Sequence, residues 1–207
     1  MFVMLFIYTL ALFIPFAYAI PTLVYDGNHC PDIACNINQY LTKINQKAVI
    51  LTRQRPLDGQ AIGPRQTTYT YDSNGKAIKQ TVCSTQAAIK AAQANRNKAC
   101  NGKDIKSVCQ GEALQLGIDV ECDEFPFATT YEGGEDAEVR CVPAWQNNLG
   151  GGGFLSGFYS NYKLQDRHEF QVTVVNLPNC RPHDIMLLRP TETQSFCATY
   201  SDMAIIT

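Results

Sequence analysis

Three carboxylates within ten residues, Asp123, Glu124 and Glu132, are the densest group of potentially reactive side chains in the sequence. Aromatic residues flank them, and Pro126 restricts the local backbone. Carboxylate oxygens bind hard divalent cations, and a carboxylate with a pKa set by burial acts as a general base. A solvated acidic loop is the alternative. The segment therefore predicts either a metal or acid–base site, or a loop without chemistry.

A second polar segment contains three amide side chains, those of Gln146, Asn147 and Asn148, followed by glycines at residues 150–153. Amide oxygens are neutral ligands for magnesium, manganese or calcium. The glycines would let a polyanion approach the backbone, and a helix starting at Phe154 would present its N-terminus to phosphate. A flexible loop is the alternative. The segment is not a P-loop, because no Gly-Lys-Ser/Thr follows.

The net charge of −2 conceals two oppositely charged halves. Residues 43–106 carry a net +9, and residues 107–207 carry a net −9. Lysine and arginine neutralise nucleic-acid phosphates without reading sequence. The basic half supplies four such cations just before the carboxylates: Arg96, Lys98, Lys103 and Lys106. A pI near 5.9 therefore does not exclude a nucleic-acid substrate.

The order of these motifs resembles the secreted deoxyribonuclease NucA/NucB family. The resemblance lies in Cys-Asp-Glu-Phe-Pro-Phe-Ala from Cys122, Glu-Gly-Gly from Glu132, Arg-Cys-Val-Pro-Ala from Arg140, and Asn before Gly-Gly, and it covers residues 87–175. It implies a small endonuclease that depends on a divalent metal ion, Mg²⁺ or Mn²⁺, and cleaves DNA, or also RNA, without sequence preference. It also implies a core related to the ββα-metal nucleases.

The resemblance further implies roles for individual residues. The ββα-metal nucleases place a metal-binding Asn on a helix opposite a general base, usually His. No His occurs between Asp119 and Arg167, so the base would be Asp123 or Glu124. The metal ligand would be Asn147 or Asn148. We assign Gln146 to the metal site with them, and Glu132 either to the metal shell or to a turn; His168 is the less favoured base, expected in a turn.

The first 19 residues predict export. They are uncharged, almost entirely apolar and end in Ala-Tyr-Ala, which is typical of a signal peptide cleaved before Ile20. An uncleaved membrane anchor is the alternative. We expect a secreted, extracellular protein that has no membrane contact after cleavage.

Nine cysteines follow the leader and favour disulfides over zinc knuckles, because only Cys30 and Cys35 stand close together. Pairing of sequence neighbours is plausible, with Cys122–Cys141 expected in particular, and we expect at least three disulfides. The other neighbour pairs are Cys30–Cys35, Cys100–Cys109 and Cys180–Cys197. Cys83 would remain as a free thiol or as a link to a disulfide-bonded partner.

The patterns predict an α+β fold: a small antiparallel sheet with helices, stabilised by disulfides. Apolar or alternating runs predict strands at residues 48–52, 67–71, 138–143 and 169–175. Helices are expected at residues 80–98 and 154–162, and a polar loop at residues 144–153. Residues 20–80 would decorate a nuclease-like core of residues 81–178, and residues 179–207 would form an irregular C-terminal extension.

Two functions without catalysis compete with the nuclease. One is a secreted, disulfide-rich binding protein or toxin on the same fold. The other is an extracellular calcium- or carbohydrate-binding module that uses the same acidic and amide ligands. Retention of Asp123, Glu124, Glu132 and an Asn favours the enzyme, since an inactive copy would be free to lose one of them.

Overall fold

The computed structural model describes residues 20–55, 66–71, 77–82, 86–101, 104–181, 185–186 and 197–201. Three predicted features lie outside these residues: the signal peptide at residues 1–19, Lys103 and Cys83. Within the described ranges, no helix has the length and apolar character needed to cross a bilayer.

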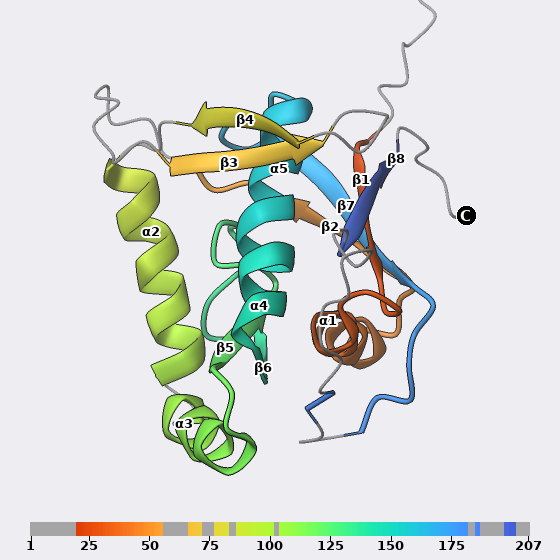
Figure 1. The fold of residues 1–207 in the computed structure, drawn as a ribbon. Helices are drawn as coiled ribbons and strands as arrows, with labels where there is room; N and C mark the ends of the chain where they lie inside the picture. The colour runs from red at the N-terminus through yellow and green to blue at the C-terminus, as the bar shows by residue number, and fades with distance from the viewer. Residues whose placement is uncertain are drawn as a thin grey trace, which may run out of the picture.

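The largest sheet has four strands in the order β2-β7-β1-β8 (Figure 1). The strands are β1 (Thr22–Asp26), β2 (Ala48–Thr52), β7 (Glu169–Val175) and β8 (Ala198–Ser201). β1 is parallel to β7, whereas β2 and β8 are antiparallel to their neighbours. Phe170 and Val172 alternate into the core, as residues i and i+2 of a strand do. The strands predicted at residues 48–52 and 169–175 are confirmed.

Helix α1 (Pro31–Lys43) follows β1 and contacts the sheet as well as β5 and β6. Pro31 begins the helix, a position that tolerates the missing amide hydrogen. Ile33, Ile37 and Leu41 recur every four residues and are buried in the core. As a result, α1 packs both against the main sheet and against β5 and β6, the segment that contains Asp123 and Glu124. No helix was expected at these residues.

The described residues also form two antiparallel ribbons: β3 (Gln66–Tyr71) with β4 (Ala77–Val82), and β5 (Val120–Phe125) with β6 (Glu138–Pro143). The strands predicted at 67–71 and 138–143 are confirmed. Phe125, at the end of β5, packs edge-on against Phe127, with ring centroids 5.0 Å apart. Both rings belong to the main core, which anchors the β5–β6 ribbon. The α+β class is therefore confirmed.

The helix expected at residues 80–98 begins later. Residues 80–82 belong to β4, where Gln80 pairs with Thr68 of β3. The helical part is α2 (Gln86–Arg96), followed by a π-helical turn, η1 (Asn97–Asn101), and then α3 (Ile105–Leu116). Pairing with a strand from earlier in the chain decides the conformation of residues 80–82, and local propensity does not contain that information.

The polar loop expected at residues 144–153 is wrong, as is a helix start at Phe154. These residues form a continuous helix: α4 (Ala144–Gln146), the π-helical η2 (Asn147–Phe154) and α5 (Leu155–Asn161). Close packing at Gly150 explains why this segment is helical rather than a loop. The helix lies so near α1 that a Cβ at Gly150 would be 2.4 Å from Ile33 Cδ1. The Tyr25 hydroxyl also donates a hydrogen bond of 2.8 Å to the Gly150 carbonyl. Tertiary contacts therefore override the low helix propensity of glycine.

Within the described residues, four disulfides connect distant segments, so the expectation of at least three is confirmed and the pairing of sequence neighbours is wrong. The pairs are Cys30–Cys197, Cys35–Cys180, Cys100–Cys122 and Cys109–Cys141. Cys122 and Cys141 do face each other across β5 and β6, but each is bonded to a helical segment instead, η1 and α3 respectively. Sequence separation contains no information about which helix covers which strand.

Residues 198–201 form β8 within the main sheet, where an irregular extension was expected. Strands from residues 20–80, 81–178 and 179–207 all pair in this sheet. The division of the chain into decoration, core and extension stays a prediction.

Mass spectrometry of a non-reduced digest should find peptides linking Cys100 to Cys122 and Cys109 to Cys141. Replacing both Cys109 and Cys141 by Ala should lower the free energy of unfolding by about 2–4 kcal/mol, because the bond restricts the unfolded chain. A peptide linking Cys122 to Cys141 in the native protein would contradict the observed pairing.

Candidate active site

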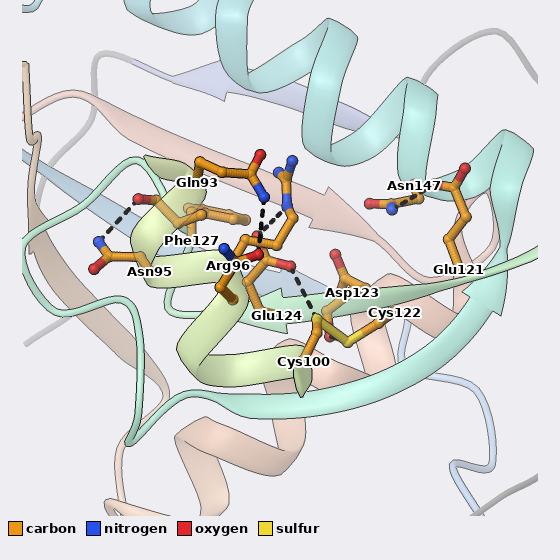
Figure 2. A network of polar contacts seen from close by, with 12 residues as sticks. Gln93, Asn95, Arg96, Cys100, Glu121, Cys122, Asp123, Glu124, Phe127 and Asn147 are labelled. Atoms are coloured by element: carbon orange, nitrogen blue, oxygen red, sulfur yellow. Dashed lines mark hydrogen bonds and ion pairs between the residues drawn. A yellow bond between two sulfur atoms is a disulfide. The ribbon is translucent and has the colours of Figure 1, made fainter. Parts of the chain in front are cut away.

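A cavity of about 550 Å³ opens between α2, α3, β5 and η2; we call it the cleft. Six of the predicted site residues line it: Arg96, Lys106, Asp123, Glu124, Asn147 and Asn148. Figure 2 shows the two carboxylates of β5 side by side, with Arg96 of α2 and Asn147 of η2 nearby. Residues up to 52 positions apart in the sequence thus line one cavity.

Asp123 and Glu124 are buried, with 5% and 6% of their surfaces exposed, and two different helices contact them. Asn36 of α1 donates a hydrogen bond of 2.7 Å from Nδ2 to Asp123 Oδ2 and one of 3.2 Å to the Asp123 carbonyl. Arg96 of α2 forms an ion pair of 3.2 Å with Glu124 Oε1. Asp123 and Glu124, which are consecutive residues of β5, therefore contact helices on opposite sides of the strand.

Burial raises the pKa of Asp123 to about 7, and the nearby charge of Glu124 contributes. The hydrogen bond from Asn36 acts in the opposite direction and favours the ionised form. Burial also raises the pKa of Glu124, while the charge of Arg96 opposes that shift. A carboxylate that titrates near neutral pH is suited to accept a proton from water, so Asp123 has the properties of a general base.

Asn147 lies on the η2 wall of the cleft. Its Nδ2 donates a hydrogen bond of 2.8 Å to Glu121 Oε2, so its amide oxygen is the atom suited to a cation. Glu121 also lines the cleft and was missed by sequence analysis. The sequence did contain a signal for Glu121: it is two residues from Asp123, and residues i and i+2 of a strand lie on the same face. Asn36, in contrast, had no signal near the motif.

A hard cation is compatible with the oxygen atoms that line the cleft. Within the part of the chain that the structure describes, no group of three or more His, Cys, Asp or Glu side chains could hold a metal ion. Mg²⁺ is usually bound by one or two carboxylates and retains several waters. The carboxylates and amides of the cleft match that chemistry better than the tetrahedral nitrogen and sulfur set of zinc.

Glu132 and Gln146, both predicted for the site, lie outside the cleft lining. Both carboxylate oxygens of Glu132 accept the backbone N–H of Thr52, at 3.1 and 3.0 Å, which connects its turn to β2. Gln146 is fully buried and forms two hydrogen bonds with Asp32 of α1, one to its carboxylate and one from its backbone N–H. Metal binding by Glu132 or Gln146 stays a prediction, and their contacts are structural.

The remaining predicted positions are also placed. Lys98 is exposed and does not line the cleft. His168 lies in a turn, as expected, where its Nδ1 accepts the backbone N–H of Gln165 at 3.1 Å. That turn is not among the residues lining the cleft.

Helix α1 presents a buried polar face to the site. Asp32 and Asn36 are one turn apart and both are 0% exposed. Asp32 forms an ion pair of 3.3 Å with Arg140, and Arg140 is the cross-strand partner of Asp123. Burial raises the pKa of Asp32 to about 6, although Arg140 opposes the shift. Thus α1 contacts both strands of the ribbon and the start of the helix that carries Asn147.

The comparison with protein families agrees with this geometry. A sequence model of the family described as deoxyribonuclease NucA/NucB matches residues 67–173, more than half of the chain. The chain belongs to the NucA/NucB deoxyribonuclease family. No curated protein matches the chain. The family segment contains Asp123, Glu124 and Asn147, but begins after α1, so Asn36 and Asp32 lie outside it.

Asn36→Ala should move the acid limb of the kcat/KM profile for DNA cleavage to higher pH. The variant loses the hydrogen bond that favours ionised Asp123, so the pKa of Asp123 rises further and less of the base is ionised below neutrality. Activity at pH 6 should fall about three- to tenfold, with recovery at higher pH. Exposed Asn161→Ala is the control; an unchanged pH profile in Asn36→Ala would contradict this role.

Glu132→Ala should reduce stability more than catalysis. The substitution leaves the Thr52 N–H without its carboxylate acceptor and lowers the free energy of unfolding by about 1–3 kcal/mol. Urea unfolding measures this effect, with exposed Glu135→Ala as the matched control. Unchanged stability combined with weakened metal binding would instead support a place for Glu132 in the metal shell.

Proposed function

We propose that the protein is a secreted endonuclease that hydrolyses DNA phosphodiester bonds with the help of Mg²⁺ or Mn²⁺ and without sequence preference. The observation that carries the proposal is the buried Asp123–Glu124 pair in a cleft with Arg96 and Asn147, within a segment that matches a deoxyribonuclease family.

Each group in the cleft has a role in this hydrolysis. Asp123 accepts the proton of the attacking water, and Asn36 orients its carboxylate. Arg96, held by Glu124, and Lys106 contact phosphate oxygens. The oxygen of Asn147, or that of Asn148, contributes to the metal site. The bound metal ion supplies charge stabilisation at the phosphoryl group.

Secretion and lack of sequence preference rest on different observations. Four disulfides are typical of an oxidising compartment, and the apolar residues 1–19 are typical of a leader peptide. Arginine and lysine in the cleft suit phosphates, which carry no sequence information. Cys83 stays a predicted free thiol or a predicted link to a second chain.

The protein purified without residues 1–19 should degrade circular, linear and single-stranded DNA. Excess chelator should abolish cleavage, and added salt should reduce it steeply. Asp123→Asn should lower kcat by about two to four orders of magnitude with an unchanged melting temperature, the range for losing a general base.

His168→Ala is the internal control and should retain activity. Full activity in excess chelator would contradict the metal mechanism. Loss of activity in His168→Ala, with most activity retained in Asp123→Asn and Glu124→Gln, would move the site to the turn at His168.

A further inference from the structure

A second cavity of about 260 Å³ lies between α2 and α5 and adjoins the cleft. Figure 1 shows these two helices side by side. The two cavities share six lining residues, so they form one groove: Gln93, Arg96, Thr129, Gly151, Gly152 and Leu155. At Gly152, an added Cβ would meet no atom within 4 Å. The space beside Gly152, which lines both cavities, is therefore open.

Arg53 lines the second cavity and has an unusual environment for a cation. Its guanidinium lies over the Tyr159 ring, 4.1 Å from the centroid, and Nη1 donates to the Leu164 carbonyl. Burial lowers the pKa of Arg53 to about 10. Among the described residues, no carboxylate lies within 4.0 Å of this guanidinium. A partly desolvated cation that has no carboxylate at ion-pair distance favours binding of an anion.

Arg55 adds a second positive charge to the same wall. Its Nη1 donates to Gln165 Oε1 at 3.3 Å, and its proximity is one cause of the lowered pKa of Arg53. The opposing charge is Asp166, which accepts the Arg55 backbone N–H at 2.7 Å and the Tyr131 hydroxyl at 3.0 Å. Asp166 is also 3.8 Å from Arg167. Asp166 itself is not among the residues that line the cavity, and it shares its charge among Arg55, Tyr131 and Arg167.

The backbone that carries the two arginines is fixed on both sides. The Arg53 N–H donates to the His168 carbonyl and the Arg167 N–H donates to the Arg53 carbonyl, both at 2.9 Å. The Gln54 N–H donates to the Thr129 carbonyl, also at 2.9 Å. The backbone of Arg53 and Gln54 is therefore held by hydrogen bonds beside Thr129, which lines both cavities.

We propose that the second cavity is a phosphate subsite: Arg53 and Arg55 bind a phosphodiester group of the same nucleic-acid strand that has its scissile phosphate in the cleft. This inference rests on the proposed function. Both arginines precede residue 67, so the subsite lies outside the segment that matches the family. It extends the nucleic-acid contacts to the opposite side of Arg96 from Lys106, since Arg96 lines both cavities and Lys106 only the cleft.

Arg55→Gln tests the subsite with two substrates of different reach. For a single-stranded 12-nucleotide DNA, kcat/KM should fall about five- to tenfold at low salt. The slope of log kcat/KM against log salt should become shallower by about 0.7, the value for one lost phosphate contact. Hydrolysis of bis(p-nitrophenyl) phosphate, which is too short to reach the second cavity, should be unchanged. Arg55→Lys should recover most of the loss.

Exposed Arg181→Gln, outside both cavities, is the matched control. Equal oligonucleotide kinetics in Arg55→Gln and Arg181→Gln would overturn the subsite, as would an equal loss on both substrates in Arg55→Gln. Fluorescence anisotropy of the labelled 12-nucleotide DNA, with and without Arg55→Gln in an Asp123→Asn background, measures the subsite without cleavage. Failure of the unmodified protein to cleave DNA would refute the proposed function and leave that binding test valid.

Discussion

Burial of Asp123 beside Glu124 is the constraint on which the site depends. Two adjacent carboxylates in a poorly solvated position repel each other and lose hydration, so each needs a compensating partner. Asn36 supplies one for Asp123, and Arg96 supplies one for Glu124. These partners come from α1 and α2, and both helices must therefore be fixed on their own sides of β5. The hydrogen bond from Asn36 offsets only part of the cost of burying the Asp123 charge, so the pKa of Asp123 stays near 7. A carboxylate with this pKa can accept a proton from water near neutral pH.

Covalent bonds and a buried polar network hold the helices in these positions. Cys100–Cys122 fixes η1, which continues α2, to the strand that carries the carboxylates, and Cys35–Cys180 fixes α1 to the segment after β7. Asp32 adds contacts from α1 to Arg140 and to Gln146, the residue before Asn147. Displacement of α1 would therefore alter both walls of the cleft. This coupling explains why residues outside the family segment belong to the site.

Local sequence patterns predict some elements of this fold and not others, for physical reasons. The strand at residues 169–175 was predictable because its alternating apolar residues report which face is buried. The helix over the glycines at residues 150–153 was not, because Ile33 and Tyr25 stabilise it from another part of the chain. Residues 80–82 were assigned to a helix on local propensity, although pairing with β3 makes them a strand.

The sequence by itself determined the chemical types at the site: two adjacent carboxylates, an amide pair before glycines, and a basic segment upstream, in the order typical of the family. These features lie within short stretches of the chain, so they can be read directly from the order of the residues. Only the tertiary structure decided which of them meet. In the folded chain, Glu132 bonds to Thr52 and Gln146 bonds to Asp32. Asn36 bonds to Asp123, which is 87 residues away in the sequence. Such contacts depend on packing between distant segments, which spacing along one chain does not encode.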